Sequence, residues 1–193
     1  MAARSFPACL IPAAAALFSA CGKDDITTYR IPKEAPPEIA AAAQTGPGAL
    51  AASSLAWTVP AGWKSRPATG MRSASFAVPA AGGECELSVV TLPGDAGGAL
   101  ANVNRWRGQL GEAALDAGSL AKAAGKVFAP AGTLLEVEIN GAGGQAGEAM
   151  AAAILSTDEN TWFFKLTGKG KAVAQARPSF LEFLRSLRPG TRS

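Results

Sequence analysis

Histidine is absent from all 193 residues of the chain. Its absence excludes Ser-His-Asp and Cys-His catalysis and removes the residue that most often binds zinc. We therefore expect no metal site and no cofactor, and we assign no catalytic residue. Cysteine is scarce, with three in the chain. Cys9 and Cys21 lie in the N-terminal targeting region described below, so Cys85 has no partner for an internal disulfide and is expected to be a buried core thiol.

The chain also has little excess charge and no long apolar run. Its 18 Lys and Arg against 15 Asp and Glu give a formal net charge of +3. Binding driven by phosphate contacts needs a much denser basic patch, so nucleic acid is not an expected partner. No run reaches the ~18 to 20 apolar residues that a helix needs to cross a bilayer. With 48% hydrophobic residues, the chain can still bury the core of one domain.

The N-terminus carries a targeting pattern. A single positive charge, Arg4, precedes the short uncharged stretch 8–20, as in the charged region and apolar core of a signal peptide. The stretch ends in Leu17-Phe18-Ser19-Ala20-Cys21-Gly22, which resembles the lipobox of bacterial lipoproteins, where small residues precede an invariant cysteine. Phe18 departs from the usual leucine at its position. An ordinary signal-peptidase site needs a small residue there, so Phe18 favours the lipoprotein interpretation.

This resemblance implies a location. Residues 1–20 would be removed as a lipoprotein signal peptide, and Cys21 would carry acyl chains of the palmitate type. A lipoprotein cysteine holds two or three chains, which anchor a protein stably where one chain does not. The protein is then expected in the cell envelope, facing the periplasm and bound to the membrane through Cys21. Gly22 is not the aspartate associated with retention in the inner membrane, so the outer membrane is favoured over the inner.

Residues 21–54 are expected to tether the anchor to a folded domain. They are rich in Ala and Pro, with prolines at 32, 36, 37 and 47. A flexible chain of this length extends on the order of 30 Å. The alternative is that part of the segment, Ile39–Gln44, is a short helix packed on the domain.

A single domain is expected over residues 55–188, followed by a tail over 189–193. Period-two alternation or short apolar runs predict strands at 55–59, 71–78, 84–92, 134–140, 149–156 and 161–167. Helical spacing predicts a helix that Asp95 caps and Gly111 ends, a weaker one over 113–124, and a last one over 171–187 that Pro178 kinks or restarts. Hairpin connections between the strands favour an α+β fold, with a mainly antiparallel sheet of about six strands packed by two or three helices.

Three segments carry a further resemblance: Trp57-Thr58-Val59-Pro60-Ala61-Gly62-Trp63, the stretch Leu92–Arg107 with its Leu-Pro-Gly-Asp-Ala-Gly-Gly and Asn-Val-Asn-Arg-Trp-Arg motifs, and Thr161–Gly168. Together they resemble a family of bacterial lipoproteins to which no activity is assigned. More coarsely, the opening strand, central helix and closing helix resemble the PsbP-like fold. That resemblance implies a non-enzymatic role in binding or assembly, and function does not follow from fold alone.

The densest polar and aromatic cluster lies in the central helix. Helical spacing directs positions 100, 103 and 110 to the core and leaves Asn102 and Arg105 on the opposite side. Exposed Arg and Asn beside Trp are typical of partner-binding surfaces. The alternative is an ordinary amphipathic helix with Trp106 in the core and solvated flanks. The partner-binding hypothesis covers Asn102, Asn104, Arg105, Trp106 and Arg107.

Two functions follow. The leading hypothesis is a lipid-anchored, non-enzymatic module that binds an envelope protein or assists assembly. The alternative is a hydrolase of the cell envelope that depends on carboxylates or on a Ser/Lys pair such as Ser179 with a nearby lysine. Glu136 and Glu138, on one face of a predicted strand, are candidate carboxylates, although such pairs on a sheet are more often solvated.

Overall fold

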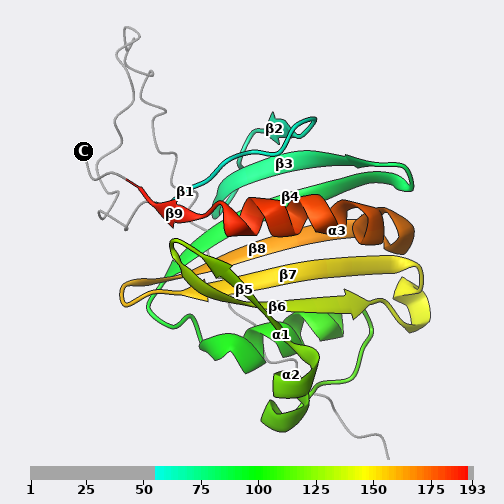
Figure 1. Ribbon diagram of the computed structural model, residues 1–193. Coiled ribbons are helices and arrows are strands. Elements are labelled where there is room, and N and C mark those ends of the chain that lie inside the picture. Colours follow the sequence, from blue (N-terminus) through cyan, green and yellow to red (C-terminus); the bar gives the residue numbers. More distant parts are fainter. Residues whose placement is uncertain (1–54, 191–193) are drawn as a thin grey trace, which may run out of the picture. The chain divides into compact units, whose positions relative to one another are not determined.

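The computed structural model describes residues 55–190 (Figure 1). Seven strands form one antiparallel sheet. In sheet order they are β2 (Lys64–Arg66), β3 (Arg72–Ala80), β4 (Gly83–Pro93), β8 (Asn160–Lys169), β7 (Glu148–Ser156), β6 (Gly132–Asn140) and β5 (Gly125–Ala129). The predicted signal peptide, Cys21 and the tether lie outside the described residues.

Three α-helices and a second, small sheet complete the described part of the chain. The helices are α1 (Gly98–Gln109), α2 (Ala117–Ala123) and α3 (Gly170–Arg185), with a short 3-10 turn η1 (Gly143–Gln145). The small sheet pairs β1 (Leu55–Ala56) with β9 (Arg188–Pro189). The predicted α+β class with a mainly antiparallel sheet is confirmed, with seven strands in the main sheet.

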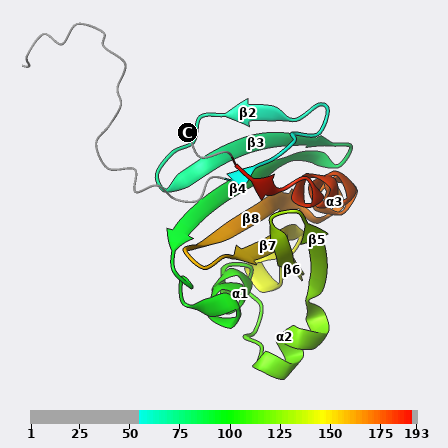
Figure 2. The same cartoon turned by 60° about the vertical axis from the view of Figure 1, so that its left-hand side comes forward.

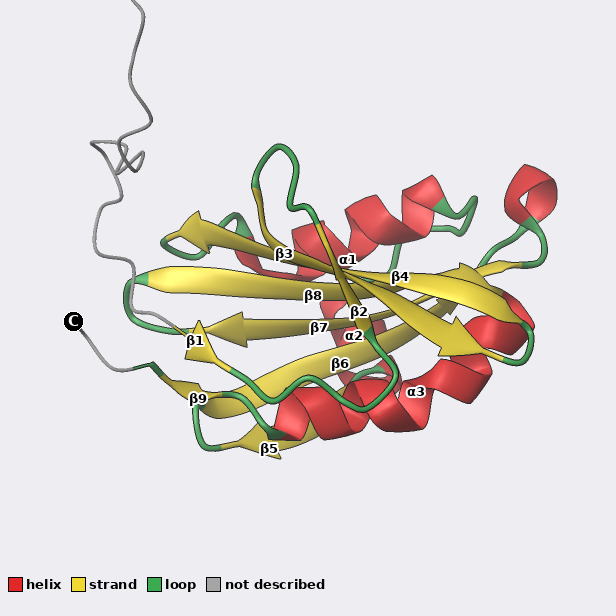
Figure 3. Cartoon of the chain, turned by 90° about the horizontal axis from the view of Figure 1, so that it is seen from above, coloured by secondary structure: helices red, strands yellow, loops and turns green. Residues whose placement is uncertain are grey.

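The sheet lies between helices. Figure 3 shows the strands with α3 on one side and α1 on the other, and Figure 2 shows α1 and α2 together on the side away from α3. Because side chains alternate along a strand, each central strand supplies one row to each side. In β8, Phe164 and Leu166 pack toward α3, while Phe163 packs toward α1. The sheet therefore has two hydrophobic cores.

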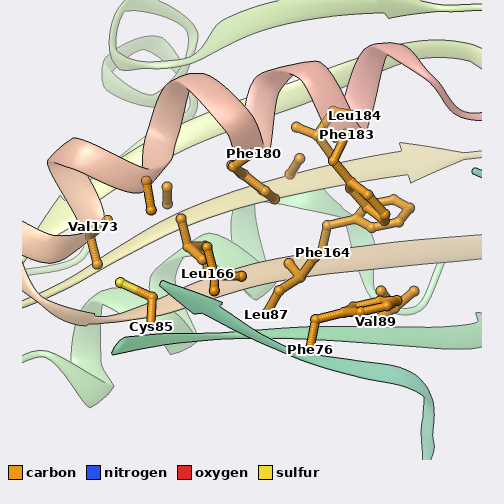
Figure 4. Packing of buried hydrophobic residues seen from close by; sticks show 14 of the residues in the cluster. Phe76, Cys85, Leu87, Val89, Phe164, Leu166, Val173, Phe180, Phe183 and Leu184 are labelled. Carbon is orange, nitrogen blue, oxygen red and sulfur yellow. The ribbon is translucent and has the colours of Figure 1, made fainter. Parts of the chain in front are cut away.

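The larger core lies under α3 (Figure 4). The helix presents Val173, Phe180, Phe183 and Leu184, all buried, toward strand residues that include Phe76, Leu87 and Phe164. Phe183 is the centre of an aromatic group, with ring centroids 5.9 Å from Trp57, 5.4 Å from Trp63, 6.0 Å from Phe76 and 6.1 Å from Phe164. The two tryptophans of the opening motif thus hold the start of the domain against α3.

Several details of the predicted elements are wrong. The strand expected over 55–59 is only two residues long and lies outside the main sheet. Strands β2 and β5 were not predicted. Of the kink or restart expected at Pro178, the restart does not occur, since α3 is continuous over Gly170–Arg185; proline removes one hydrogen bond while the buried stripe on either side still packs on the sheet. Gly97, not Asp95, is the N-cap of α1, since Asp95 Oδ1 accepts from the Gly97 N–H in the preceding turn at 3.1 Å.

Within residues 55–190, no helix combines the length and apolar character needed to cross a membrane.

Candidate functional site

Asn102 and Trp106 are buried, which corrects the predicted exposure of Asn102. Asn102 is 2% exposed. Its Nδ2 donates to the carbonyls of Ala96 at 2.9 Å and Gly98 at 2.7 Å, so it binds the glycine-rich turn that leads into α1. Trp106 packs edge-on against Phe163, with centroids 5.8 Å apart. Both residues hold α1 in place, as the amphipathic-helix alternative expects for Trp106.

Asn104 and Arg107 fix the loop after α1. Asn104 Nδ2 donates to the Leu115 carbonyl at 2.9 Å, and its Oδ1 accepts from the Leu115 N–H at 2.8 Å. Arg107 Nε donates to the Ala113 carbonyl at 2.6 Å, and its Nη2 contacts Glu112 Oε2 at 3.0 Å. These side chains replace backbone partners that the irregular segment 110–116 cannot supply itself.

Arg105 is the member of the predicted cluster that remains exposed. Its guanidinium donates to Asn102 Oδ1, which holds the side chain against the helix surface. No carboxylate of residues 55–190 forms an ion pair with it. Of the five residues in the partner-binding hypothesis, Arg105 thus presents an exposed charge.

Arg105 borders a hollow of about 230 Å³ beside α1. The hollow lies on the sheet face that carries Phe163 and is lined by apolar side chains with two cations. Lys165 of β8 lies at the hollow together with Arg105 of α1. The sequence alone gave no reason to place these two cations together. The lining residues are Met71, Val90, Leu92, Arg105, Trp106, Phe163 and Lys165.

Further charged residues extend from the hollow across β4, β3 and β2. Residues paired across antiparallel strands point to the same face, and the register places Lys165 beside Ser88, Ser88 beside Ser75, and Ser75 beside Arg66. We call this surface the basic face. It comprises five cations and two carboxylates: Lys64, Arg66, Arg72, Arg105 and Lys165 with Glu84 and Glu86.

Both carboxylates of the basic face are already engaged. Glu84 pairs with Arg66, and Glu86 pairs with Arg72. Glu86 also accepts from the Ser75 hydroxyl at 3.1 Å. Within the described residues, Lys64, Arg105 and Lys165 are left without a carboxylate in ion-pair contact, and the last two line the hollow.

The surroundings of Lys165 lower its pKa. Burial lowers the pKa of its ammonium group, and the nearby charges of Arg105 and Arg72 lower it further, while Glu86 opposes the shift. Desolvation and like charges both disfavour the protonated form. Perturbed cations of this kind gather at functional sites more often than elsewhere.

A second hollow, of about 410 Å³, lies between α2, β5 and β6. Its lining is apolar apart from Lys126 and Thr133, and it comprises Ala121, Ala124, Gly125, Lys126, Thr133, Leu134 and Leu135. Lys126 is the one charged residue in this lining. This second hollow therefore offers less to orient a ligand than the hollow at Arg105.

The residues considered for hydrolase chemistry are held in structural contacts. Glu136 is buried and faces α3, which corrects the expectation that it is solvated. Arg177 of α3 binds it through Nε–Oε1 at 3.1 Å and Nη2–Oε2 at 3.0 Å, and contacts Glu138 Oε1 at 2.6 Å. The Ser179 hydroxyl donates to the Ala176 carbonyl of its own helix at 2.9 Å.

Cys85 is buried on the α3 side of β4, as predicted, and burial raises the pKa of its thiol. No group of three or more His, Cys, Asp or Glu side chains within residues 55–190 is arranged to hold a metal ion.

No protein-family model and no curated protein sequence matches the chain. Solved structures of similar fold include the three that follow. A protein from Bacteroides thetaiotaomicron shares 11% identity at a TM-score of 0.44, over 72% of this chain and 46% of its own length. This chain therefore spans less than half of that protein.

The other two structures cover more of their own chains. LpqN, described as involved in cell envelope biogenesis of Mycobacterium tuberculosis, shares 10% identity at a TM-score of 0.48, over 76% of this chain and 88% of its own. Cyanobacterial PsbP from Synechocystis shares 12% identity at a TM-score of 0.44, over 76% and 99%. The expected PsbP-like fold thus has a PsbP among its structural neighbours, and similarity this distant transfers no activity.

Proposed function

We propose that the protein is a lipid-anchored, non-enzymatic binding module of the bacterial cell envelope. In this proposal Cys21 carries the lipid, the domain faces the periplasm, and the outer membrane is the host membrane. The domain binds an envelope protein through the hollow at Arg105. The support for the anchor is the lipobox pattern at residues 17–22.

The observation that carries the binding role is the meeting of two unpaired cations with an apolar hollow on the basic face. Apolar contacts supply affinity, while charges set orientation and the choice of partner. Met71 lies at the hollow and is 75% exposed. Met71 thus adds an accessible apolar side chain to the lining of the hollow.

Photo-crosslinking in intact cells tests this function. A photoreactive phenylalanine analogue replaces Met71 in one strain and Phe128 in a control strain. Phe128 is a suitable control because it is 72% exposed and belongs to β5, at the far edge of the sheet. We expect a defined adduct from position 71, its loss with Arg105→Glu, and none from position 128. Equal adducts from both positions, or none from position 71, would contradict the proposal.

A further inference from the structure

The hollow at Arg105 is sized for one side chain. Its volume is about 230 Å³, and pockets that enclose a whole small molecule range from about 300 to 1,000 Å³. The hollow is walled by Trp106, Phe163, Val90 and Leu92. Such a lining favours burial of one apolar group of about this size.

The charges around the hollow determine which residues of a partner can flank the buried apolar group. Arg105 and Lys165 both line it, and the carboxylates of the basic face are taken by Arg66 and Arg72. A partner that brought cations would meet repulsion from both, whereas carboxylates next to the apolar group would meet cations with which to pair. Charge complementarity therefore selects an acidic partner.

The electrostatic environment of Lys165 also favours an acidic partner. Its charge is partly desolvated and is repelled by Arg105 and Arg72, which the attraction of Glu86 offsets only in part, so a further anion would favour the charged form. A carboxylate placed at the hollow would relieve this repulsion. Groups held in an unfavourable state by the fold are typical of sites that wait for a ligand.

We infer that the partner is a protein segment in which one leucine- or phenylalanine-sized side chain, flanked by Asp or Glu, enters the hollow while the flanking carboxylates pair with Arg105 and Lys165. This inference rests on the proposed function and specifies the ligand of that same site. An anionic bilayer would also attract the cations. Its acyl chains, however, lie beneath the headgroups, so it would leave the hollow without an apolar occupant.

Synthetic peptides test the inference by titration calorimetry. The protein is the full chain with Cys21→Ser, which keeps lipid out of the measurement. The probes are capped peptides of sequence Glu-Glu-Phe-Glu-Glu, Glu-Glu-Ala-Glu-Glu and Lys-Lys-Phe-Lys-Lys. We expect the first to bind at least tenfold more tightly than the second, because a buried aromatic group supplies that much affinity, and the third not to bind.

Protein variants separate the contribution of the cations from that of the fold. Arg105→Glu should weaken binding of Glu-Glu-Phe-Glu-Glu at least fivefold, and the double variant Arg105→Glu/Lys165→Glu should bind Lys-Lys-Phe-Lys-Lys instead. Lys171→Glu makes the same charge change at an exposed position of α3 and should bind as the parent does. Met71→Asp, at an exposed position, should weaken binding without a change in circular dichroism, so the test stands even if the double variant does not fold.

Three results would overturn the inference: equal binding of the phenylalanine and alanine peptides, no effect of Arg105→Glu, or Arg105-dependent binding of phosphatidylglycerol vesicles without binding of the acidic peptide. If the acidic peptide fails while the Arg105-dependent crosslink from position 71 persists, the ligand class is wrong and the proposed function stands. If both fail, the proposed function fails as well.

Discussion

Arg177 of α3 and Glu136 of β6 are joined by two parallel hydrogen bonds, Nε to Oε1 at 3.1 Å and Nη2 to Oε2 at 3.0 Å. Glu136 is 4% exposed, so the pair links the helix to the sheet where the carboxylate has little access to water. The hydrogen bonds to Glu136 also raise the pKa of Arg177. Planar two-bond pairing of this kind fixes orientation as well as distance.

Removing one member of this pair should destabilise the fold. We expect Arg177→Ala to lower the free energy of unfolding by about 3 kcal/mol, because it leaves the Glu136 charge buried without its partner. The double variant Arg177→Met/Glu136→Met should recover most of that loss. Glu138→Gln is the control, since Glu138 is 51% exposed and its pairing should contribute less than about 1 kcal/mol. Urea unfolding measures all three, and equal losses from Arg177→Ala and Glu138→Gln would refute the argument.

Gly168 is required by its contact with Cys85. A Cβ at position 168 would lie 3.0 Å from Cys85 Sγ and 3.4 Å from Cys85 Cα, and the thiol is buried, so it cannot move aside freely. We expect Gly168→Ala to destabilise by about 1 to 3 kcal/mol and Cys85→Ala in the same chain to relieve part of the loss. Gly108→Ala in α1, where a Cβ meets no atom within 4 Å, should instead stabilise by about 0.5 to 1 kcal/mol. Thermal unfolding of the three variants and the parent provides the comparison.

Lys165 should oppose stability while it supports binding. Its folded pKa is lowered from the ordinary 10.5, so its unfavourable effect on folding is fully present below the folded pKa and disappears as the pH rises past 10.5. At pH 7, Lys165→Met should therefore raise the free energy of unfolding, by less than about 1 kcal/mol because the group is half-exposed. The same variant should lose affinity for Glu-Glu-Phe-Glu-Glu. Lower stability together with lower affinity would point to a purely structural role.

The N-cap residue of α2, Asp116, makes a pH-dependent contribution to stability. Its carboxylate accepts from the Ser119 N–H at 2.8 Å and the Ser119 hydroxyl at 3.0 Å, and these bonds lower its pKa from the ordinary 3.8. A lowered carboxyl pKa means that the stabilisation is present above 3.8 and is lost as the pH falls through the folded value. The parent should therefore lose stability relative to Asp116→Asn over that range, as measured by urea unfolding at several pH values. A difference that does not change with pH would count against this role.

The proposed lipid anchor on Cys21 has a direct chemical test. In cells grown with an alkyne analogue of palmitate, the parent chain should be labelled and Cys21→Ser should not, because the acyl chains need the Cys21 thiol. Cys85→Ser serves as the control and should retain the label, since Cys85 is buried. Labelling that persists in Cys21→Ser would remove the anchor from the proposed function.

Period-two alternation predicted the long strands because each has an apolar row that must face a core. It did not predict β2 and β5 because these strands lack such an apolar row. Lys64, Ser65 and Arg66 are all exposed, and β5 buries only Val127. Backbone pairing at the sheet edges, and not an apolar pattern, holds these two strands.

The candidate site was only partly predictable. The sequence placed Arg105 in a polar and aromatic cluster, but a helical wheel treats asparagine as solvent-facing and gave no reason to bury Asn102. Its burial follows from the carbonyls of Ala96 and Gly98 in the turn before α1. Lys165 lies sixty residues further along the chain, and only the pairing of β4 with β8 and the packing of α1 bring it to the hollow. Glu136 was misjudged because the polar side of its strand lies beneath a helix.

The pairing of Leu55 with Pro189 has a mechanical consequence. The first and last strands of the domain pair with each other, so its two ends lie side by side. A force that pulls these ends apart therefore acts on the two-residue β1–β9 contact and not on the seven-stranded sheet. Domains whose ends meet tolerate attachment at either end. A partner fused at either end of the described domain would therefore start beside β1 and β9.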